Sequence, residues 1–275
     1  MEPKFVQRDS KYRIDLLFFA SSIGILLLFL LLYQTGVPQI IQDISRGLIH
    51  RTLLLNTLLL LGAVYGVLIR YGGMRALDLG MDINKLPPAA ILGALIWVFV
   101  QLIQGLVGYI TNGTITIDPT WNTDATSNIG LFIGMLFGTA LYEEIGFRGY
   151  LLTQFINKLN KPWSKVYTIS LALIISQALF TLLHIPWMIM NRGWTTAIIP
   201  DLLFSVFMNG IIYGLFYLRT KNLFFVIIVH ALGNAPIGLI EAPIDPSSIT
   251  LLLAIICYIA WPFMKQIIQH RTVGY

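Results

Sequence analysis

Three ionisable side chains, Glu143, Glu144 and Arg148, lie within six positions of one long apolar stretch. A single charge at the centre of a membrane helix costs about 2.5 to 3.5 kcal/mol on insertion scales, so each of these groups needs a partner or a function. Residues four apart share a helix face, so Glu144 can pair with Arg148. Glu143 projects about 100° away from Glu144 and has no cation within helical reach. Glu143 is therefore the candidate for chemistry, and the Glu144–Arg148 pair is the candidate for its support.

Two of the four histidines, His184 and His230, also lie in apolar stretches, and Asn234 follows His230 at a spacing of four. That spacing places His230 and Asn234 on one helix face. Taken singly, each of these residues is explained by a hydrogen bond to a neighbouring helix. Together with Glu143 they make a carboxylate, two imidazoles and a carboxamide, which are the groups of a hydrolytic site that activates water.

The elements that must position these groups are membrane helices. The chain has 275 residues, of which 56% are hydrophobic and 11% charged, and its mean hydropathy is +0.76, whereas an ordinary soluble domain is about 25% charged. A span needs about 20 apolar residues. Eight windows fit: 16–33, 52–70, 88–110, 129–152, 166–189, 200–218, 223–240 and 249–266. Because lipid offers the backbone no hydrogen-bond partner, each window should be helical. The sequence predicts an all-α, polytopic bundle of about eight transmembrane helices with an intramembrane polar cavity, in a single membrane domain, 1–275.

The basic residues indicate the orientation of this bundle. All Lys and Arg residues except Arg46, Arg51 and Arg192 fall on one side of the eight-span map. By the positive-inside rule that side is cytoplasmic, so both termini are cytoplasmic and the protein is a multi-pass protein of a cell membrane. The net charge of +5 is dispersed among loops, which argues against a nucleic-acid partner.

One distance conflicts with this map. His184 follows Lys165 by 19 residues, about 28 Å along a helix, whereas His230 lies about 12 Å from its own flank. The fifth span must therefore tilt strongly or begin deeper, and a cytoplasmic amphipathic stretch near 155–167 would remove the conflict.

At these residues the chain resembles the CPBP family of intramembrane proteases, which includes the Rce1-like CAAX prenyl endopeptidases and the bacterial Abi proteins. The family's first motif, two glutamates, three residues and an arginine, corresponds to Glu143–Arg148. Its second motif, Phe and then His four residues later, corresponds to Phe180–His184, and its third, His and then Asn, to His230–Asn234. The three motifs occur in order on separate predicted spans, within a catalytic core at 129–240.

The resemblance implies an endopeptidase that hydrolyses a peptide bond in a membrane-embedded, membrane-associated or lipid-modified substrate. Glu143 and His184 would activate a water, and His230 and Asn234 would stabilise the oxyanion. The supporting residues would be Glu144, Arg148 and Phe180. We expect no cofactor. The alternative is zinc held by Glu143, His184 and His230, a common catalytic set, although their spacing is not that of a His-Glu-x-x-His helix.

Two other functions compete with this interpretation. A non-catalytic membrane regulator or bacteriocin self-immunity protein of the same fold would bind a partner, but binding alone needs no isolated Glu143. A proton-coupled transporter also uses membrane-embedded Glu and His, yet it would show broken helices in matching halves of the chain, and no such duplication is present. The compact chain without long loops favours a bacterial plasma membrane.

Overall fold

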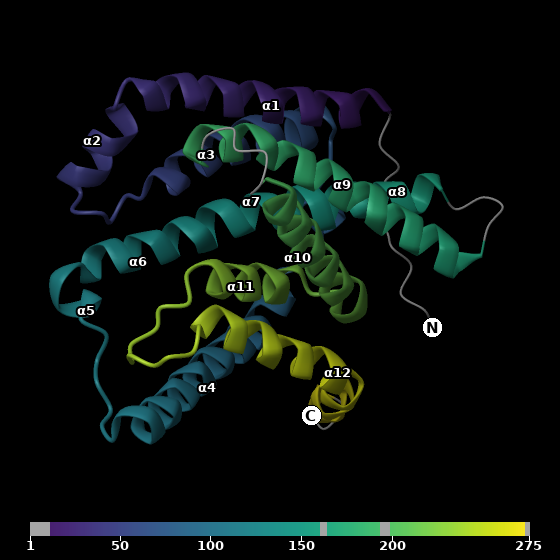
Figure 1. Cartoon of the computed structure of the whole chain (residues 1–275). Helices are drawn as coiled ribbons and strands as arrows, with labels where there is room; N and C mark the ends of the chain where they lie inside the picture. The colour runs from purple at the N-terminus through teal and green to yellow at the C-terminus, as the bar shows by residue number, and fades with distance from the viewer. Residues whose placement is uncertain (1–11, 160–163, 193–198, 273–275) are drawn as a thin grey trace.

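The computed structural model describes residues 12–159, 164–192 and 199–272, and within these ranges the chain is a bundle of helices without a β-strand (Figure 1). The α-helices are α1 Tyr12–Gln34, α2 Val37–Ile44, α3 Arg51–Leu59, α4 Leu86–Asn112, α5 Thr120–Thr123, α6 Ala125–Gly134, α7 Leu141–Glu143, α8 Thr153–Lys158, α9 Lys165–Arg192, α10 Ile199–Thr220, α11 Leu223–Asn234 and α12 Pro246–Thr272. Three stretches of π-helix, η1 Leu60–Tyr71, η4 Met135–Ala140 and η5 Glu144–Leu152, continue α-helices, and η2 Ala76–Leu79 and η3 Ile83–Lys85 are short 3-10 turns. The ends of the chain, whose side of the membrane was predicted from charge, lie outside the described residues.

Seven helical segments of the described chain are long and apolar enough to cross a membrane. They are Arg13–Gln34, Arg51–Tyr71, Ile83–Asn112, Ala125–Lys158, Lys165–Pro186, Pro200–Thr220 and Pro246–Phe263. The prediction of an all-α polytopic bundle is thereby confirmed, and the chain is a multi-pass membrane protein.

The predicted span 223–240 is wrong in its second half. Its helix, α11, ends at Asn234 and is about 18 Å long at 1.5 Å per residue, against about 30 Å of hydrocarbon. Nine of its residues are buried, and it lies inside the bundle against α4, α10 and α12 (Figure 1). Hydropathy overestimated the helix because apolar residues such as Ile237 and Ile240 continue beyond its end.

The segment after α11 continues along α4 without a helix. A Cβ on Gly93 of α4 would lie 2.3 Å from Ile228, and a Cβ on Gly108 would lie 2.9 Å from the Glu241 carbonyl oxygen. The earlier residue of α4, Gly93, lies beside the earlier residue Ile228, and the later residue Gly108 lies beside the later residue Glu241. The chain from α11 to residue 241 therefore runs parallel to α4. This direction is the one that the eight-span map expects for the segment that begins at Leu223, and the number of crossings stays a prediction.

Non-helical backbone at membrane depth needs hydrogen-bond partners from the protein, and side chains supply them here. Trp97 Nε1 donates to the Ile237 carbonyl at 3.0 Å. Gln101 donates to the same carbonyl at 3.3 Å and accepts from the Leu239 amide at 2.7 Å. Trp121 Nε1 donates to the Gly238 carbonyl at 2.6 Å. A backbone bridge also joins Ile117 to Ile240.

Gln101→Leu should therefore destabilise the protein by about 1–3 kcal/mol, because it leaves the Leu239 amide without its acceptor. Thermal unfolding in detergent measures the effect. Gln39→Leu is the matched control, since Gln39 is an exposed residue of α2 whose amide bonds only the neighbouring Asp43. Equal stability of the two variants would contradict the role given to Gln101.

The conflict over the depth of His184 is resolved by the length of two antiparallel helices. The segment Ala125–Lys158 has 34 residues, more than a bilayer requires, so it extends beyond the membrane. Helix α9 runs back along it, since Thr168 contacts the Leu159 carbonyl and Ser176 the Phe147 carbonyl. Lys165, at the start of α9, is close enough to the loop residue Lys221 to lower its pKa, so the start of α9 lies at the level of the loops. The amphipathic stretch expected near 155–167 is not a separate element: 153–158 is the end of the long helical segment and α9 begins at 165, while 160–163 lie outside the described residues.

Three lysines from distant loops meet at one end of the bundle. Lys85 Nζ donates to the Lys221 carbonyl oxygen at 2.7 Å. Burial, together with the charges of Lys165 and Lys85, lowers the pKa of Lys221 to about 8. The loops that precede α4, α9 and α11 thus share one side of the membrane, as the charge map requires. That this side is the cytoplasm stays a prediction.

Candidate functional site

The first motif lies where the fourth crossing changes from α-helix to π-helix, between α7 and η5. π-helical turns are rare and often occur at functional sites. All nine residues of η5 are buried. A Cβ on Gly146 would lie 2.7 Å from the Phe18 ring, and one on Gly149 would lie 2.3 Å from the Leu79 carbonyl oxygen. Because neighbouring chain is this close, the motif helix is held tightly against α1 and η2.

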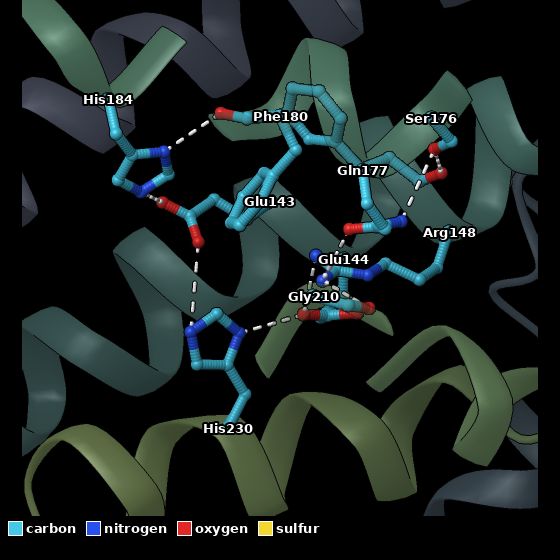
Figure 2. A network of polar contacts seen from close by, with 10 residues as sticks. Glu143, Glu144, Arg148, Ser176, Gln177, Phe180, His184, Gly210 and His230 are labelled. Carbon is cyan, nitrogen blue, oxygen red and sulfur yellow. Dashed lines mark hydrogen bonds and ion pairs between the residues drawn. The ribbon is translucent and has the colours of Figure 1, made fainter. Parts of the chain in front are cut away.

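Glu144 and Arg148 form the ion pair that their spacing predicted, with Glu144 Oε1 3.0 Å from Arg148 Nη1 and both side chains fully buried. The same Oε1 lies 2.7 Å from His230 Nδ1. His230 is 86 positions away in the chain, so this contact could not be read from local spacing. Glu144 therefore joins the first motif to the third, as Figure 2 shows.

Arg148 has further partners on α9 and α10. Its Nη2 donates to Gln177 Oε1 and to the Gly210 carbonyl, each at 3.2 Å. The guanidinium also lies over the Phe180 ring, 4.7 Å from the centroid. Sequence reasoning missed Gln177, although it precedes Phe180 by three and His184 by seven and so shares their face of the helix. Phe180, named as a supporting residue, thus contacts Arg148, and its supporting role stays a prediction.

Glu143 lies between the two imidazoles (Figure 2). Its Oε1 is 3.6 Å from His184 Nε2, and its Oε2 is 3.7 Å from His230 Nε2. These separations are too long for direct hydrogen bonds and suit contact through one water. The Glu143 side chain is 13% exposed and that of His184 is 25% exposed, whereas Glu144 is completely buried. Of the two glutamates, Glu143 is thus the one open to a small molecule.

Hydrogen bonds orient both imidazoles. Nδ1 of His184 is 2.9 Å from the Phe180 carbonyl oxygen, which can only accept, so Nδ1 carries a proton. Nδ1 of His230 faces the Glu144 carboxylate and carries a proton for the same reason. In the neutral form of each ring, Nε2 then holds the lone pair and points toward Glu143.

Asn234 is the last residue of α11. Together with Glu143 and His184 it lines two adjoining cavities. Within the described chain its carboxamide has no hydrogen-bond partner, so both its N–H groups are available. The structure therefore brings together all four residues that the sequence nominated for catalysis. Their catalytic roles stay predictions.

The two cavities differ in chemical character. The first has a volume of about 190 Å³ and extends between α1, α3 and α9 along a mainly apolar surface, to which Leu26, Phe29, Leu55 and Leu183 contribute. The second, of about 110 Å³, lies toward α10 and is lined by Asn209 and Tyr213. Glu143 and His184 border both. A substrate in the apolar cavity would meet the carboxylate at its polar end.

The sequence also raised a zinc site made of Glu143, His184 and His230. Among the described residues, no group of three His, Cys, Asp or Glu side chains is arranged to hold a metal ion.

A helical membrane bundle with a carboxylate, two imidazoles and a carboxamide around a buried cavity defines a candidate intramembrane hydrolase. Residues 125–236 match the model of a protein family described as type II CAAX prenyl endopeptidase Rce1-like. The resemblance seen in the motifs is confirmed: the matched residues include all three motifs, and the family described by this model supports a CAAX-type intramembrane protease at the level of the family. Neither the curated proteins nor the solved structures include a match to the chain.

Proposed function

We propose that this protein is an intramembrane endopeptidase in which Glu143 and His184 activate a water molecule. The observation that carries the proposal is the placement of Glu143 Oε1 3.6 Å from His184 Nε2 at the border of two cavities. Both atoms accept hydrogen bonds, so one water can donate a hydrogen to each. That arrangement directs the oxygen lone pair away from them, toward a peptide carbonyl carbon in the cavity.

The reaction then follows the usual course of general-base hydrolysis. Glu143 takes a proton from the water as its oxygen attacks the carbonyl carbon. The tetrahedral intermediate collapses when the C–N bond breaks, and the proton held by Glu143 passes to the leaving amine. His184 orients the water, and the Phe180 carbonyl holds the His184 ring in place.

Asn234 is the better of the two candidate oxyanion donors. Its carboxamide N–H groups are available whatever the pH. His230 already uses its Nδ1–H toward Glu144, so it can donate from Nε2 only when both ring nitrogens are protonated. We therefore assign the oxyanion primarily to Asn234. When both of its ring nitrogens are protonated, His230 donates a second hydrogen bond to the oxyanion. When it is neutral, its ring lies between Glu143 and the buried Glu144–Arg148 pair and contacts both glutamates.

The apolar cavity supports a membrane-associated or lipid-modified peptide as substrate. Its walls suit apolar side chains or an acyl-type chain, and they lead to the polar groups at Glu143. We place the enzyme in a bacterial plasma membrane with both termini in the cytoplasm, as the one-sided distribution of the basic residues and the compact chain support.

Comparison of peptides released from membranes tests this proposal. Membranes containing the wild-type protein or the His184→Ala variant are incubated, and soluble peptides are identified by mass spectrometry. We expect a set of peptides with new termini whose rate of release falls about 10²-fold in the variant, because Glu143 remains but its water is no longer oriented. Leu102→Ala, at a side chain 60% exposed on the outside of α4, should release the same peptides as the wild type.

The alternative is a regulator or self-immunity protein of the same fold. It predicts identical peptide sets from wild-type and His184→Ala membranes, with the cellular phenotype retained in the variant. That outcome would reject the protease assignment.

A further inference from the structure

The apolar cavity at Glu143 has a basic residue, Arg51, at its far end. Among the described residues that line this cavity, Arg51 is the only Lys or Arg, and Glu143 is the only carboxylate. Arg51 begins the span Arg51–Tyr71, whose other end leads into the loop of Lys85, so Arg51 lies on the side of the membrane opposite the three lysines. It is also outside residues 125–236, which match the family model, so that match gives it no role.

The guanidinium of Arg51 retains donors for a ligand. Its Nη1 donates to the Tyr33 hydroxyl at 2.6 Å, and its central carbon lies 5.4 Å from the centre of the Tyr33 ring. Within the described chain the guanidinium has no other hydrogen bond and no carboxylate partner. Tyr33 follows Phe29, a residue that lines the cavity, by one helical turn. The guanidinium therefore lies at the end of the cavity with most of its five N–H groups available.

Two contacts between α3 and the fourth crossing give the length of the cavity. A Cβ on Gly134 would lie 2.6 Å from Thr52 Oγ1, and Asn56 Nδ2 donates to Thr139 Oγ1 at 2.9 Å. The two helices therefore run side by side in the same direction, with Thr52 level with Gly134. Glu143 follows Gly134 by nine residues, which is about 13 Å at 1.5 Å per residue. The start of α3 and Glu143 are thus about 13 Å apart along the bundle.

We propose that Arg51 binds the C-terminal carboxylate of the peptide substrate and so selects peptides that end shortly after the cleaved bond. The inference rests on the proposed function, which places the cleaved bond at Glu143. Arginine pairs strongly with carboxylates because its planar group donates two parallel hydrogen bonds to them. An extended chain covers about 3.3–3.6 Å per residue, so about four residues bridge the distance from Glu143 to Arg51.

The cavity between the two charged residues suits such a segment. Its volume is about 190 Å³, its surface is mainly apolar, and it is open along part of that surface. It can therefore receive one or two apolar side chains while the peptide backbone follows the open side. The C-terminus of the bound peptide then points toward the side of the membrane opposite the three lysines.

Binding of a labelled peptide tests the proposal. The probe carries fluorescein at its N-terminus and ends in Leu-Ala-Val-Leu, either as the free acid or as the C-terminal amide. Fluorescence anisotropy is measured with the full chain in detergent, in a Glu143→Gln background so that the peptide stays intact. We expect the acid to bind at least tenfold more tightly than the amide. After the further change Arg51→Gln the two peptides should bind alike, whereas Arg51→Lys should keep part of the preference.

Arg46→Gln is the matched control, because it removes the same charge from the same side of the membrane. Arg46 is exposed between α2 and α3 and is outside the cavity lining. This variant should keep the full preference for the acid. The two affinities are compared within each variant, so a small loss of stability in Arg51→Gln does not imitate the expected result.

Three outcomes would overturn the proposal: equal binding of acid and amide before Arg51 is changed, a preference that survives Arg51→Gln, or a preference that Arg46→Gln abolishes. Displacement of both peptides by phosphatidylglycerol but not by phosphatidylcholine, without a preference for the acid, would show instead that Arg51 holds a lipid phosphate.

Cleavage of the same two peptides by the wild-type protein separates this inference from the proposed function. Equal cleavage of acid and amide would support the hydrolase and reject the role of Arg51. A preference for the acid in binding, without cleavage of either peptide, would support the role of Arg51 and reject the hydrolase.

Discussion

Glu143→Gln should lower the rate of peptide-bond cleavage by about 10⁴-fold, the upper end of what general-base catalysis contributes. The amide has the size of the carboxylate but cannot take a proton from water. Stability should change little, because Glu143 has no direct hydrogen bond to either imidazole and retains some exposure. The measurement is the single-turnover rate of peptide release in proteoliposomes, with thermal unfolding recorded in parallel.

Glu143→Asp provides the comparison for this variant. It keeps the carboxylate but moves it back by one methylene, away from the Nε2 atoms of His184 and His230. Its rate should lie between those of the wild type and Glu143→Gln. A Glu143→Gln protein that keeps more than a tenth of the wild-type rate would show that the general base is another group.

Arg148→Met should reduce the free energy of unfolding by about 3–5 kcal/mol, the cost of breaking a buried ion pair from one side. The change leaves the Glu144 carboxylate fully buried with His230 as its remaining charged or polar contact. It also removes the donor from Gln177 Oε1 and the Gly210 carbonyl oxygen. Reversible unfolding in mixed micelles measures the loss, and cleavage should fall because Glu144 holds the His230 ring.

The double variant Glu144→Gln, Arg148→Met separates charge from packing. The amide introduced by Glu144→Gln still offers an oxygen to His230 Nδ1, but it carries no charge that needs a partner. Replacing both members of a buried pair is often nearly neutral, so more than half of the lost stability should return. A double variant as unstable as Arg148→Met would mean that the arginine stabilises this region by packing and hydrogen bonding.

Hydropathy predicted most of the crossings because lipid offers the backbone no hydrogen-bond partner, so an apolar stretch that faces lipid must be helical. The window 52–70 corresponds to Arg51–Tyr71 and the window 200–218 to Pro200–Thr220. The rule fails at 223–240, since a protein interior accepts apolar residues in any backbone conformation. There the side chains of Trp97 and Gln101, on another helix, make the hydrogen bonds to the backbone that a helix would otherwise make itself. No local sequence pattern predicts these contacts.

In the site, residue types and short spacings were enough to nominate Glu143 and to pair Glu144 with Arg148, because neighbours on one helix are related by helix geometry alone. Contacts between helices depend on how the helices pack. The bond from Glu144 to His230, the support of Arg148 by Gln177 and the direction of both Nε2 atoms toward Glu143 belong to this second kind. The amino-acid sequence thus named the groups that could hydrolyse a peptide bond. Their distances, protonated nitrogens and shared cavity come from the packing of α7, α9 and α11, which brings distant residues into contact.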